Sequence, residues 1–255
     1  MSEKNYNPTE LLICTASRLM PDKTTVFVGT GIPMLAGSLA QKMHAPDLVA
    51  IFEFGGTGAI LDELPIAVGG QRTFHRAVSA SGLLEIIETA QRGFVDYGFL
   101  GGAQIDPYGN LNSTVIGDHA KPKARLPGSG GGNDVGSHCW HTIAIMRHDT
   151  RRFVEQVDFI TTPGYLTGPG AREAAGLPVD TGPYRVVTTL AVLGYEQDSK
   201  RMMLLETQPG VSVDDVVENT GFDLVIPDSV GENPPPSDEE LRLLREEVDR
   251  DRLYI

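Results

Sequence analysis

The chain opens with apolar side chains at helical spacing. After Asn7-Pro8-Thr9-Glu10, which places a proline in the first turn, they recur every three or four residues. This pattern predicts an amphipathic helix whose apolar face is turned toward a core. The residues of that face are Leu11, Leu12, Ala16, Leu19 and Met20.

Short runs of β-branched, aromatic and other apolar residues predict the strands, which are expected at 24–28, 48–52, 95–100, 142–146 and 157–161. Helical patterns separate the first three runs, at 33–43 and 83–90. A hairpin is predicted from 185–195 and 201–207, and a helix from 214–219. Prolines at 234–236 then break the chain, and Ser237 with Glu240 begins a last charged helix in a capping-box pattern.

This alternation of strands and helices predicts an α/β fold with a mainly parallel open sheet flanked by helices. Ligands bind to such sheets at the carboxyl ends of the strands. A length of 255 residues fits a single domain, 1–255, in which 233–255 form a proline-rich linker and a C-terminal helix.

Charge and composition argue against several classes of partner and location. The net charge of −13 argues against nucleic acid and anionic membrane surfaces as partners, because both are bound through lysine and arginine. No run approaches the roughly 18 apolar residues of a membrane helix, and the N-terminus shows no signal-peptide pattern. Two lone cysteines, Cys14 and Cys139, make no disulfide framework, so a cytoplasmic location is expected.

One short segment is basic although the chain as a whole is acidic. Lys121, Lys123 and Arg125 stand at alternate positions just before a glycine-rich stretch. They are either a solvated loop or a contact for an anionic ligand such as coenzyme A, and the spacing alone does not decide between the two.

Glu53 is the most unusual candidate for chemistry. It ends an apolar strand and is followed by Phe54, Gly55 and Gly56. A carboxylate at the carboxyl end of a strand, beside a backbone that a ligand can approach, is suited to nucleophilic attack. The alternative is an ordinary strand-end glutamate that faces solvent or caps the next segment.

The stretch Gly128-Ser-Gly-Gly-Gly-Asn-Asp134 is the second candidate. Glycines reach positive φ and let a backbone direct several N–H groups at one anion or oxyanion. It lacks the Gly-Lys-Ser/Thr ending of a nucleotide P-loop, and a flexible surface turn is the alternative.

Two further motifs are weak signals of a functional site, and a third motif is absent. Gly29-Thr-Gly31 lacks the third glycine of a dinucleotide fingerprint, because Met34 occupies that position. His138-Cys139-Trp140-His141 is an incomplete metal set, and a strand that enters the core with Trp140 is the preferred interpretation. No Gly-x-Ser-x-Gly elbow of a serine hydrolase is present.

Taken together, these segments resemble the β-type subunits of class I coenzyme A transferases, which include the B subunit of glutaconate CoA-transferase. The similarity runs from about residue 6 to about residue 249. It is carried by VGTGIPMLAGSLAQKMHAPD, FLGGAQIDPYGNLNST, IGDHAKPKARLPGSGGGND and ENTGFDLVIP. The Glu-x-Gly pattern of the family falls on Glu53-Phe54-Gly55 and its Gly-x-Gly-Gly loop on Gly128–Gly131.

The resemblance implies a CoA transferase that acts on short carboxylic or dicarboxylic acids through a glutamyl-CoA thioester on Glu53. Oxyanion or CoA-binding residues are then expected at Gly128, Gly130, Gly131 and Gly132, and a substrate pocket at Phe54 and Gly55. Coenzyme A enters as the thioester substrate, and no metal or other cofactor is implied.

The resemblance also implies an α-type subunit that completes the site, in a higher hetero-oligomer. Close relatives within the family carry Glu-Ser-Gly, whereas Phe54 replaces the serine here, so the identity of the acids stays open. Phe54 could narrow the pocket, favour an apolar or aromatic acyl group, or pack into the core. Two further functions also stay open: an acyl-CoA hydrolase, ring-opening hydrolase or decarboxylase on the same scaffold, and a non-catalytic assembly subunit.

Overall fold

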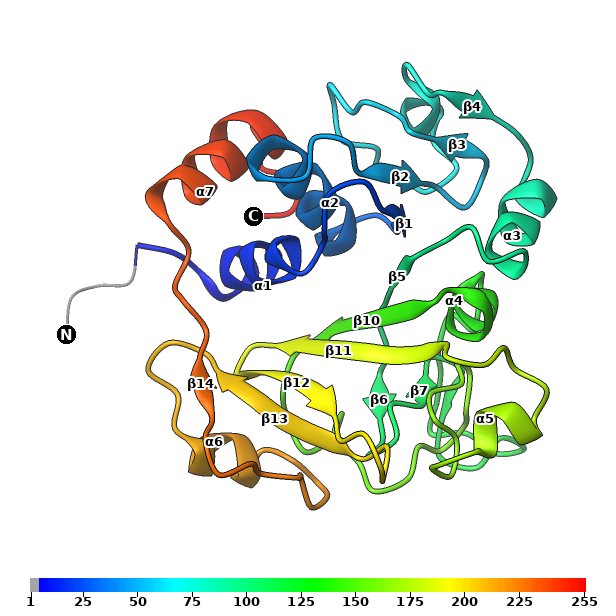
Figure 1. The fold of residues 1–255 in the computed structure, drawn as a ribbon, viewed down its shortest axis with the longest axis vertical. Helices are drawn as coiled ribbons and strands as arrows, with labels where there is room; N and C mark the ends of the chain where they lie inside the picture. The colour runs from blue at the N-terminus through cyan, green and yellow to red at the C-terminus, as the bar shows by residue number, and fades with distance from the viewer. Residues whose placement is uncertain (1–4) are drawn as a thin grey trace. The chain divides into compact units, whose positions relative to one another are not determined.

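The computed structural model describes residues 5–255, and its backbone contacts divide into two units. Unit 1 runs to Phe99 and resumes at Pro235–Ile255, whereas unit 2 comprises Leu100–Pro234 (Figure 1). The C-terminal helix therefore belongs with the N-terminal part of the chain. The expectation of a single domain stays a prediction.

Unit 1 is built on short strands in the order β5-β1-β2-β3-β4. Their bounds are β1 (Thr25–Phe27), β2 (Val49–Ile51), β3 (Gly56–Thr57), β4 (Ser79–Ala80) and β5 (Tyr97–Leu100). β1 pairs in parallel with β2 and with β5, whereas β3 and β4 add antiparallel strands at one edge. The register sets Val26 beside Ala50, so β1 and β2 end side by side.

The helices of unit 1 follow the predicted positions. They are α1 (Pro8–Arg18), α2 (Ile32–Met43), α3 (Leu83–Gln91) and α7 (Asp238–Leu243), with shorter turns η1 (Gln71–Phe74) and η2 (Leu244–Val248). Asn7 with Glu10 caps α1, and Ser237 with Glu240 caps α7, each by a reciprocal pair of side-chain to backbone hydrogen bonds. α2 contacts both α1 and α7, and the three helices gather on one side of the strands (Figure 1).

Apolar burial holds these helices together. Ile13, Leu35 and Leu39 are fully buried, and burial of one such side chain contributes roughly 1.5–3 kcal/mol. Cys14 also lies in this core, and burial raises the pKa of its thiol to about 12. Such a thiol does not ionise near neutral pH, so Cys14 is a packing residue.

Unit 2 contains the second set of strands, in the order β14-β13-β12-β11-β10. They are β10 (His141–Met146), β11 (Gly182–Thr188), β12 (Ala191–Tyr195), β13 (Met202–Thr207) and β14 (Gly231–Glu232). β10 runs parallel to β11 and β13 parallel to β14, whereas β11, β12 and β13 form antiparallel pairs. The fully buried side chains of these strands include Ile143, Val187 and Leu193.

Two small ladders and three short helices complete unit 2. The ladders are β6 (Gln104–Ile105) with β7 (Leu111–Asn112) and β8 (Val115–Ile116) with β9 (Ala124–Arg125). The helices are α4 (Gly132–His138), α5 (Ala171–Ala174) and α6 (Val213–Glu218). The combination of helices with parallel strands in both units confirms the predicted α/β class. None of the helices within residues 5–255 is long and apolar enough to cross a membrane.

Three predictions for unit 2 are wrong. No strand forms at 157–161, because the adjacent residues Phe159 and Ile160 are both exposed and the Asp158 N–H donates to the Gln104 side chain at 3.0 Å. The predicted hairpin does form, from β12 and β13, but the segment 185–195 is two strands and not one. The Thr188 hydroxyl accepts the N–H groups of residues 190 and 191 and turns the chain.

The third wrong prediction concerns Trp140. Its side chain is exposed, and the strand that enters the core begins one residue later, at His141. Cys139 just before it is buried at the end of α4. Within residues 5–255 no group of three or more His, Cys, Asp or Glu side chains is placed to hold a metal ion.

Candidate active site

Glu53 lies in a tight turn directly after β2. The Phe52 N–H donates to the Gly56 carbonyl at 2.8 Å, and the Gly55 N–H donates to the Phe52 carbonyl at 2.9 Å. Glu53 and Phe54 are thus the two central residues of a four-residue turn that joins β2 to β3. Glu53 is half-buried, and β2 is one of the parallel strands, so its carboxylate stands at the carboxyl end of the sheet, where the sequence predicted it.

Packing requires glycine at positions 55 and 56, where the turn ends and β3 begins. A β-carbon added to Gly55 would overlap the Ser81 carbonyl, and one added to Gly56 would overlap the Thr73 carbonyl. Gly55 also has a φ of 122°, which side-chain-bearing residues rarely adopt. The Ser81 N–H in turn donates to the Gly55 carbonyl at 3.1 Å. The segment 73–81 therefore holds the turn, and with it the backbone of Glu53, in one position.

Phe54 lies on the surface of unit 1, where its side chain is 47% exposed. Its ring covers the backbone of Gly69: ring carbons lie 3.3–3.4 Å from the point that a Gly69 β-carbon would occupy. Packing into the core is therefore not the role of Phe54. The other two roles, narrowing a pocket or contacting an apolar acyl group, stay predictions.

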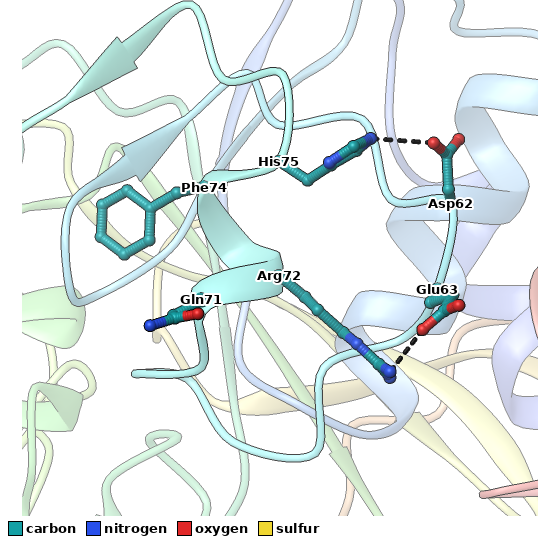
Figure 2. Close-up of a pocket in the computed structure, with 6 residues that line it drawn as sticks. All are labelled: Asp62, Glu63, Gln71, Arg72, Phe74 and His75. Atoms are coloured by element: carbon teal, nitrogen blue, oxygen red, sulfur yellow. Dashed lines mark hydrogen bonds and ion pairs between the residues drawn. The ribbon is translucent and has the colours of Figure 1, made fainter.

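A pocket of about 440 Å³ lies next to this turn and was not predicted from the sequence. Its lining residues are Asp62, Glu63, Gln71, Arg72, Phe74 and His75. Figure 2 shows Arg72 and His75 directed at the carboxylates of Glu63 and Asp62, with Phe74 on the other side of η1. The His75 Nε2 atom lies 2.8 Å from the Asp62 carboxylate.

Phe74 connects this pocket to the Glu53 turn. Its Cε1 atom lies 3.3 Å from the point that a Gly55 β-carbon would occupy. The pocket could not be predicted because its charged residues come from a loop and a single turn of helix with neither periodicity nor a motif. The one signal in the sequence was the density of opposite charges across 62–76.

The predicted glycine loop belongs to unit 2, whereas Glu53, Phe54 and Gly55 belong to unit 1. It runs from β9 into α4, and Gly128 and Gly130 have positive φ values of 95° and 48°. Gly128 is paired in both directions with Ser113: its N–H donates to the Ser113 carbonyl, and its carbonyl accepts the Ser113 hydroxyl, each at 2.8 Å. These two hydrogen bonds fix the position of the backbone at the start of the loop.

Two glycines of the loop form hydrogen bonds with nearby serines. The Gly128 N–H serves Ser113, and the Gly132 N–H donates to the Ser129 carbonyl at 2.9 Å. Gly130 and Gly131 lie between these two glycines, and their role as backbone donors to a ligand stays a prediction. Gly131 has a φ of −76°, which any residue can adopt, so its backbone conformation does not require glycine.

Comparisons with known proteins address the family of the whole chain. The family described as coenzyme A transferase matches residues 9–219. The B subunit of glutaconate CoA-transferase from Acidaminococcus fermentans is 40% identical, covering 98% of this chain and 96% of that protein. The B subunit of 3-oxoadipate CoA-transferase from Pseudomonas knackmussii is 36% identical, covering 94% and 92%.

A solved structure gives the same result for the fold. The crystal structure of glutaconate coenzyme A-transferase from Acidaminococcus fermentans superimposes with a TM-score of 0.94 at 38% identity, covering 99% of this chain and 98% of that one. The match extends through both units, and the resemblance found in the sequence is confirmed. By sequence and by fold, the chain belongs to the coenzyme A transferase family.

Proposed function

We propose that this chain is the β-type subunit of a heteromeric CoA transferase, which moves coenzyme A between short carboxylic or dicarboxylic acids with Glu53 as the nucleophile. One observation supports the assignment of Glu53 above all: in a chain of this family, its carboxylate occupies the turn at the carboxyl end of a parallel strand, and packed glycines fix the backbone of that turn.

The chemistry proceeds through covalent steps on Glu53. Its carboxylate attacks the acyl-CoA carbonyl, which forms a mixed anhydride and releases CoA as the thiolate. The thiolate attacks the Glu53 carbonyl of the anhydride, which forms a glutamyl-CoA thioester and releases the donor acid as its carboxylate. An acceptor carboxylate then reverses both steps. Only acyl and thiolate groups move, so the cycle requires no metal or redox cofactor.

Each attack passes through a tetrahedral oxyanion that needs hydrogen-bond donors. Gly130 and Gly131 supply backbone N–H groups for this role, and one such donor contributes about 3 kcal/mol to the transition state. Gly128 and Gly132 hold the loop through their bonds to Ser113 and Ser129. Phe54 and Gly55 form the wall of the acyl pocket next to Glu53.

The proposal includes a second polypeptide. The relatives at 40% and 36% identity are named as B subunits, and this chain covers almost their full length. We therefore expect an α-type subunit to complete the pocket, in a larger hetero-oligomer. A location in a reducing cytoplasm stays a prediction from two buried cysteines that form no disulfide within residues 5–255.

The test is mass spectrometry of the chain co-expressed with its α-type subunit, after incubation with a panel of acyl-CoAs and no acceptor acid. We expect a CoA adduct on the peptide that contains Glu53, and the acyl-CoA that produces it identifies the donor class. Glu53→Gln removes the nucleophile and should abolish both adduct and transfer while assembly persists. Glu88→Gln, on the exposed face of α3, is the matched control and should behave as wild type.

Two outcomes would reject the proposal. Steady release of free CoA without an adduct would indicate a hydrolase on the same scaffold. Full transfer by the Glu53→Gln complex would mean that the partner carries the chemistry and that this chain serves in assembly.

A further inference from the structure

The β8–β9 ladder of unit 2 carries an ordered, basic tip. Val115 pairs with Arg125 and Ile116 with Ala124. The Lys123 N–H donates to the Ile116 carbonyl at 2.8 Å. The Asp118 carboxylate accepts the N–H groups of Ala120 at 2.7 Å and Lys121 at 3.3 Å, which shapes the loop between the strands. The backbone that presents the cations is therefore held before any ligand arrives.

The charges of this tip are not neutralised by the protein. Lys121, Lys123 and Arg125 are exposed, and none of them forms an ion pair with a carboxylate among residues 5–255. The two acids of this region are engaged elsewhere: Asp118 in its own loop, and Asp158 with Gln104 at 3.0 Å and the Gly117 N–H at 2.9 Å. In a chain with a net charge of −13, three neighbouring unpaired cations favour an anionic ligand.

A flat aromatic surface adjoins the cations. The His119 and Phe159 rings stack with centroids 5.4 Å apart and an interplanar angle of 27°. The Arg125 Nη2 atom donates to the His119 carbonyl at 2.8 Å, which fixes the guanidinium beside the stack. Phe159 is 38% exposed although it is fully apolar. A stacking platform next to cations is typical of sites that bind a nucleobase together with its phosphates, whereas phosphate alone needs no platform.

The tip is continuous with the candidate oxyanion loop. Arg125 stands three positions before Gly128 in the chain, and Lys123 stands five positions before it. The Leu126 N–H donates to the Thr114 carbonyl at 3.0 Å and the Gly128 N–H to the Ser113 carbonyl at 2.8 Å, so this connection is also fixed. At about 3.5 Å per extended residue, Arg125 and Lys123 lie at most ~18 and ~25 Å along the chain from Gly130.

The pantetheine arm of coenzyme A is short enough to fit within these distances. The pantetheine arm between the thiol and the diphosphate contains about twelve bonds, which is the length of about four extended residues, or ~14 Å. A thioester carbonyl at Gly130 and Gly131 would thus set the diphosphate near Arg125 and Lys123. The adenosine and its 3′-phosphate would lie beyond it, near Lys121 and the His119–Phe159 stack.

From these observations we infer that the β8–β9 tip, with Lys121, Lys123, Arg125 and the His119–Phe159 stack, binds the phosphorylated adenosine of coenzyme A. The inference rests on the proposed function and adds a recognition subsite separate from the reacting groups. Such a subsite acts on substrate binding and leaves the chemical steps unchanged.

The first test measures binding alone. The full-length chain, assembled with its α-type subunit, is titrated calorimetrically with adenosine 3′,5′-bisphosphate, inorganic phosphate and adenosine. We expect the bisphosphate to bind more tightly than either fragment, with an affinity that falls as salt rises. Lys121→Ala, Lys123→Ala and Arg125→Ala should each raise its Kd about tenfold. Arg147→Ala, an exposed cation of the same unit, should leave the Kd unchanged.

Phe159→Ala tests the platform separately and should weaken the bisphosphate while leaving phosphate binding unaltered. Equal affinity for phosphate and bisphosphate would overturn the nucleotide assignment. Wild-type affinity in the three cation variants would overturn the site. Both readouts are independent of turnover, so they stand even if the proposed transfer reaction is not observed.

The second test is kinetic. Removal of the cations should raise KM for acyl-CoA while leaving kcat and all parameters for the matching acyl-pantetheine unchanged, because the truncated substrate lacks the adenosine phosphates. An equal rise in KM for both substrates would contradict the subsite. Absence of transfer with either substrate in the wild-type complex would instead reject the proposed function, and the binding data would then decide the subsite by themselves.

Discussion

The ring of Phe54 lies against the backbone of Gly69, with its Cδ1 atom 3.3 Å from the position of a Gly69 β-carbon. This contact joins the Glu53 turn to the loop that leads into the pocket of Figure 2. Relatives with the pattern Glu-Ser-Gly carry serine at this position, and serine could not cover Gly69 in the same way. The relationship therefore makes Phe54 the first residue to change in a study of acid specificity.

Phe54→Ser should shift the preference among acceptor acids. Loss of the ring enlarges the space next to Glu53 and removes an apolar surface. We expect the ratio of kcat/KM for an aromatic acid to that for a small dicarboxylic acid to fall about tenfold, within the range that one apolar contact provides. Competition between two acids in one assay measures this ratio directly. Phe94→Ser, at another exposed phenylalanine of unit 1, should leave the ratio at its wild-type value.

Gly56→Ala tests the packing that holds the turn. Because an alanine β-carbon would overlap the Thr73 carbonyl, the backbone must move, and we expect a loss of about 3 kcal/mol in the free energy of unfolding. Urea unfolding measures it. Gly29→Ala is the control, since nothing lies within 4 Å of its added β-carbon, and its cost should be small. Equal stability of the two variants would show that the turn tolerates rearrangement.

Much of this turn could be predicted from the sequence, and the reason is physical. An apolar run that ends in Glu53 and then glycines predicts a strand followed by a tight turn, and both formed. The contact between Phe54 and Gly69 could not be predicted, because it joins residues of two loops without periodicity. The same holds for β3 and β4, which have two residues each and are set by pairing across the sheet.

Gly131→Val separates access to the backbone from conformation. With φ at −76°, Gly131 can be replaced without backbone strain, so stability should change little. A side chain at this position should block approach to the N–H groups of the loop and lower kcat by about a hundredfold, the effect of one lost oxyanion donor. Gly101→Val is the control, because the nearest atom to its added β-carbon is the Ile145 carbonyl oxygen at 3.9 Å. Unchanged turnover in Gly131→Val would exclude the oxyanion role.

The glycine loop was predicted only in part. Glycine density predicted a loop that a ligand can approach, but it could not identify which glycines need positive φ. Gly128 and Gly130 do, whereas Gly131 does not. That distinction arises from the bonds of Gly128 to Ser113, a residue fifteen positions earlier in the chain. Pairings of this kind follow from the folded arrangement of β7, β8 and β9.

His148 should make the stability of unit 2 decrease measurably as the pH falls. Its ring is buried, stacks on Phe153 with centroids 3.9 Å apart, and places its nitrogens 3.0 Å from the Thr188 hydroxyl and 2.9 Å from the Thr220 hydroxyl. Burial lowers the pKa of His148 from 6.5 to about 4, although Asp149 acts in the opposite direction. The fold thus favours the neutral ring.

The folded and unfolded pKa values of His148 determine the direction in which stability changes with pH. Above the unfolded pKa of 6.5 the contribution of His148 is fully present, and it is lost as pH falls through the folded value of about 4, a total of about 3 kcal/mol. Asp106 has the reverse effect, because burial raises its pKa to about 6, so its contribution is present at low pH and lost as pH rises through that value. The wild-type curve therefore sums two opposite slopes.

The difference between wild type and His148→Gln isolates the histidine, since Asp106 is common to both. Unfolding by urea at intervals from pH 7 to pH 4 should show that the variant loses less stability toward acid. The gap between the two curves should close by up to ~1.4 kcal/mol per pH unit. Parallel curves for wild type and His148→Gln would mean that the buried ring accepts a proton in the fold as readily as in the unfolded chain.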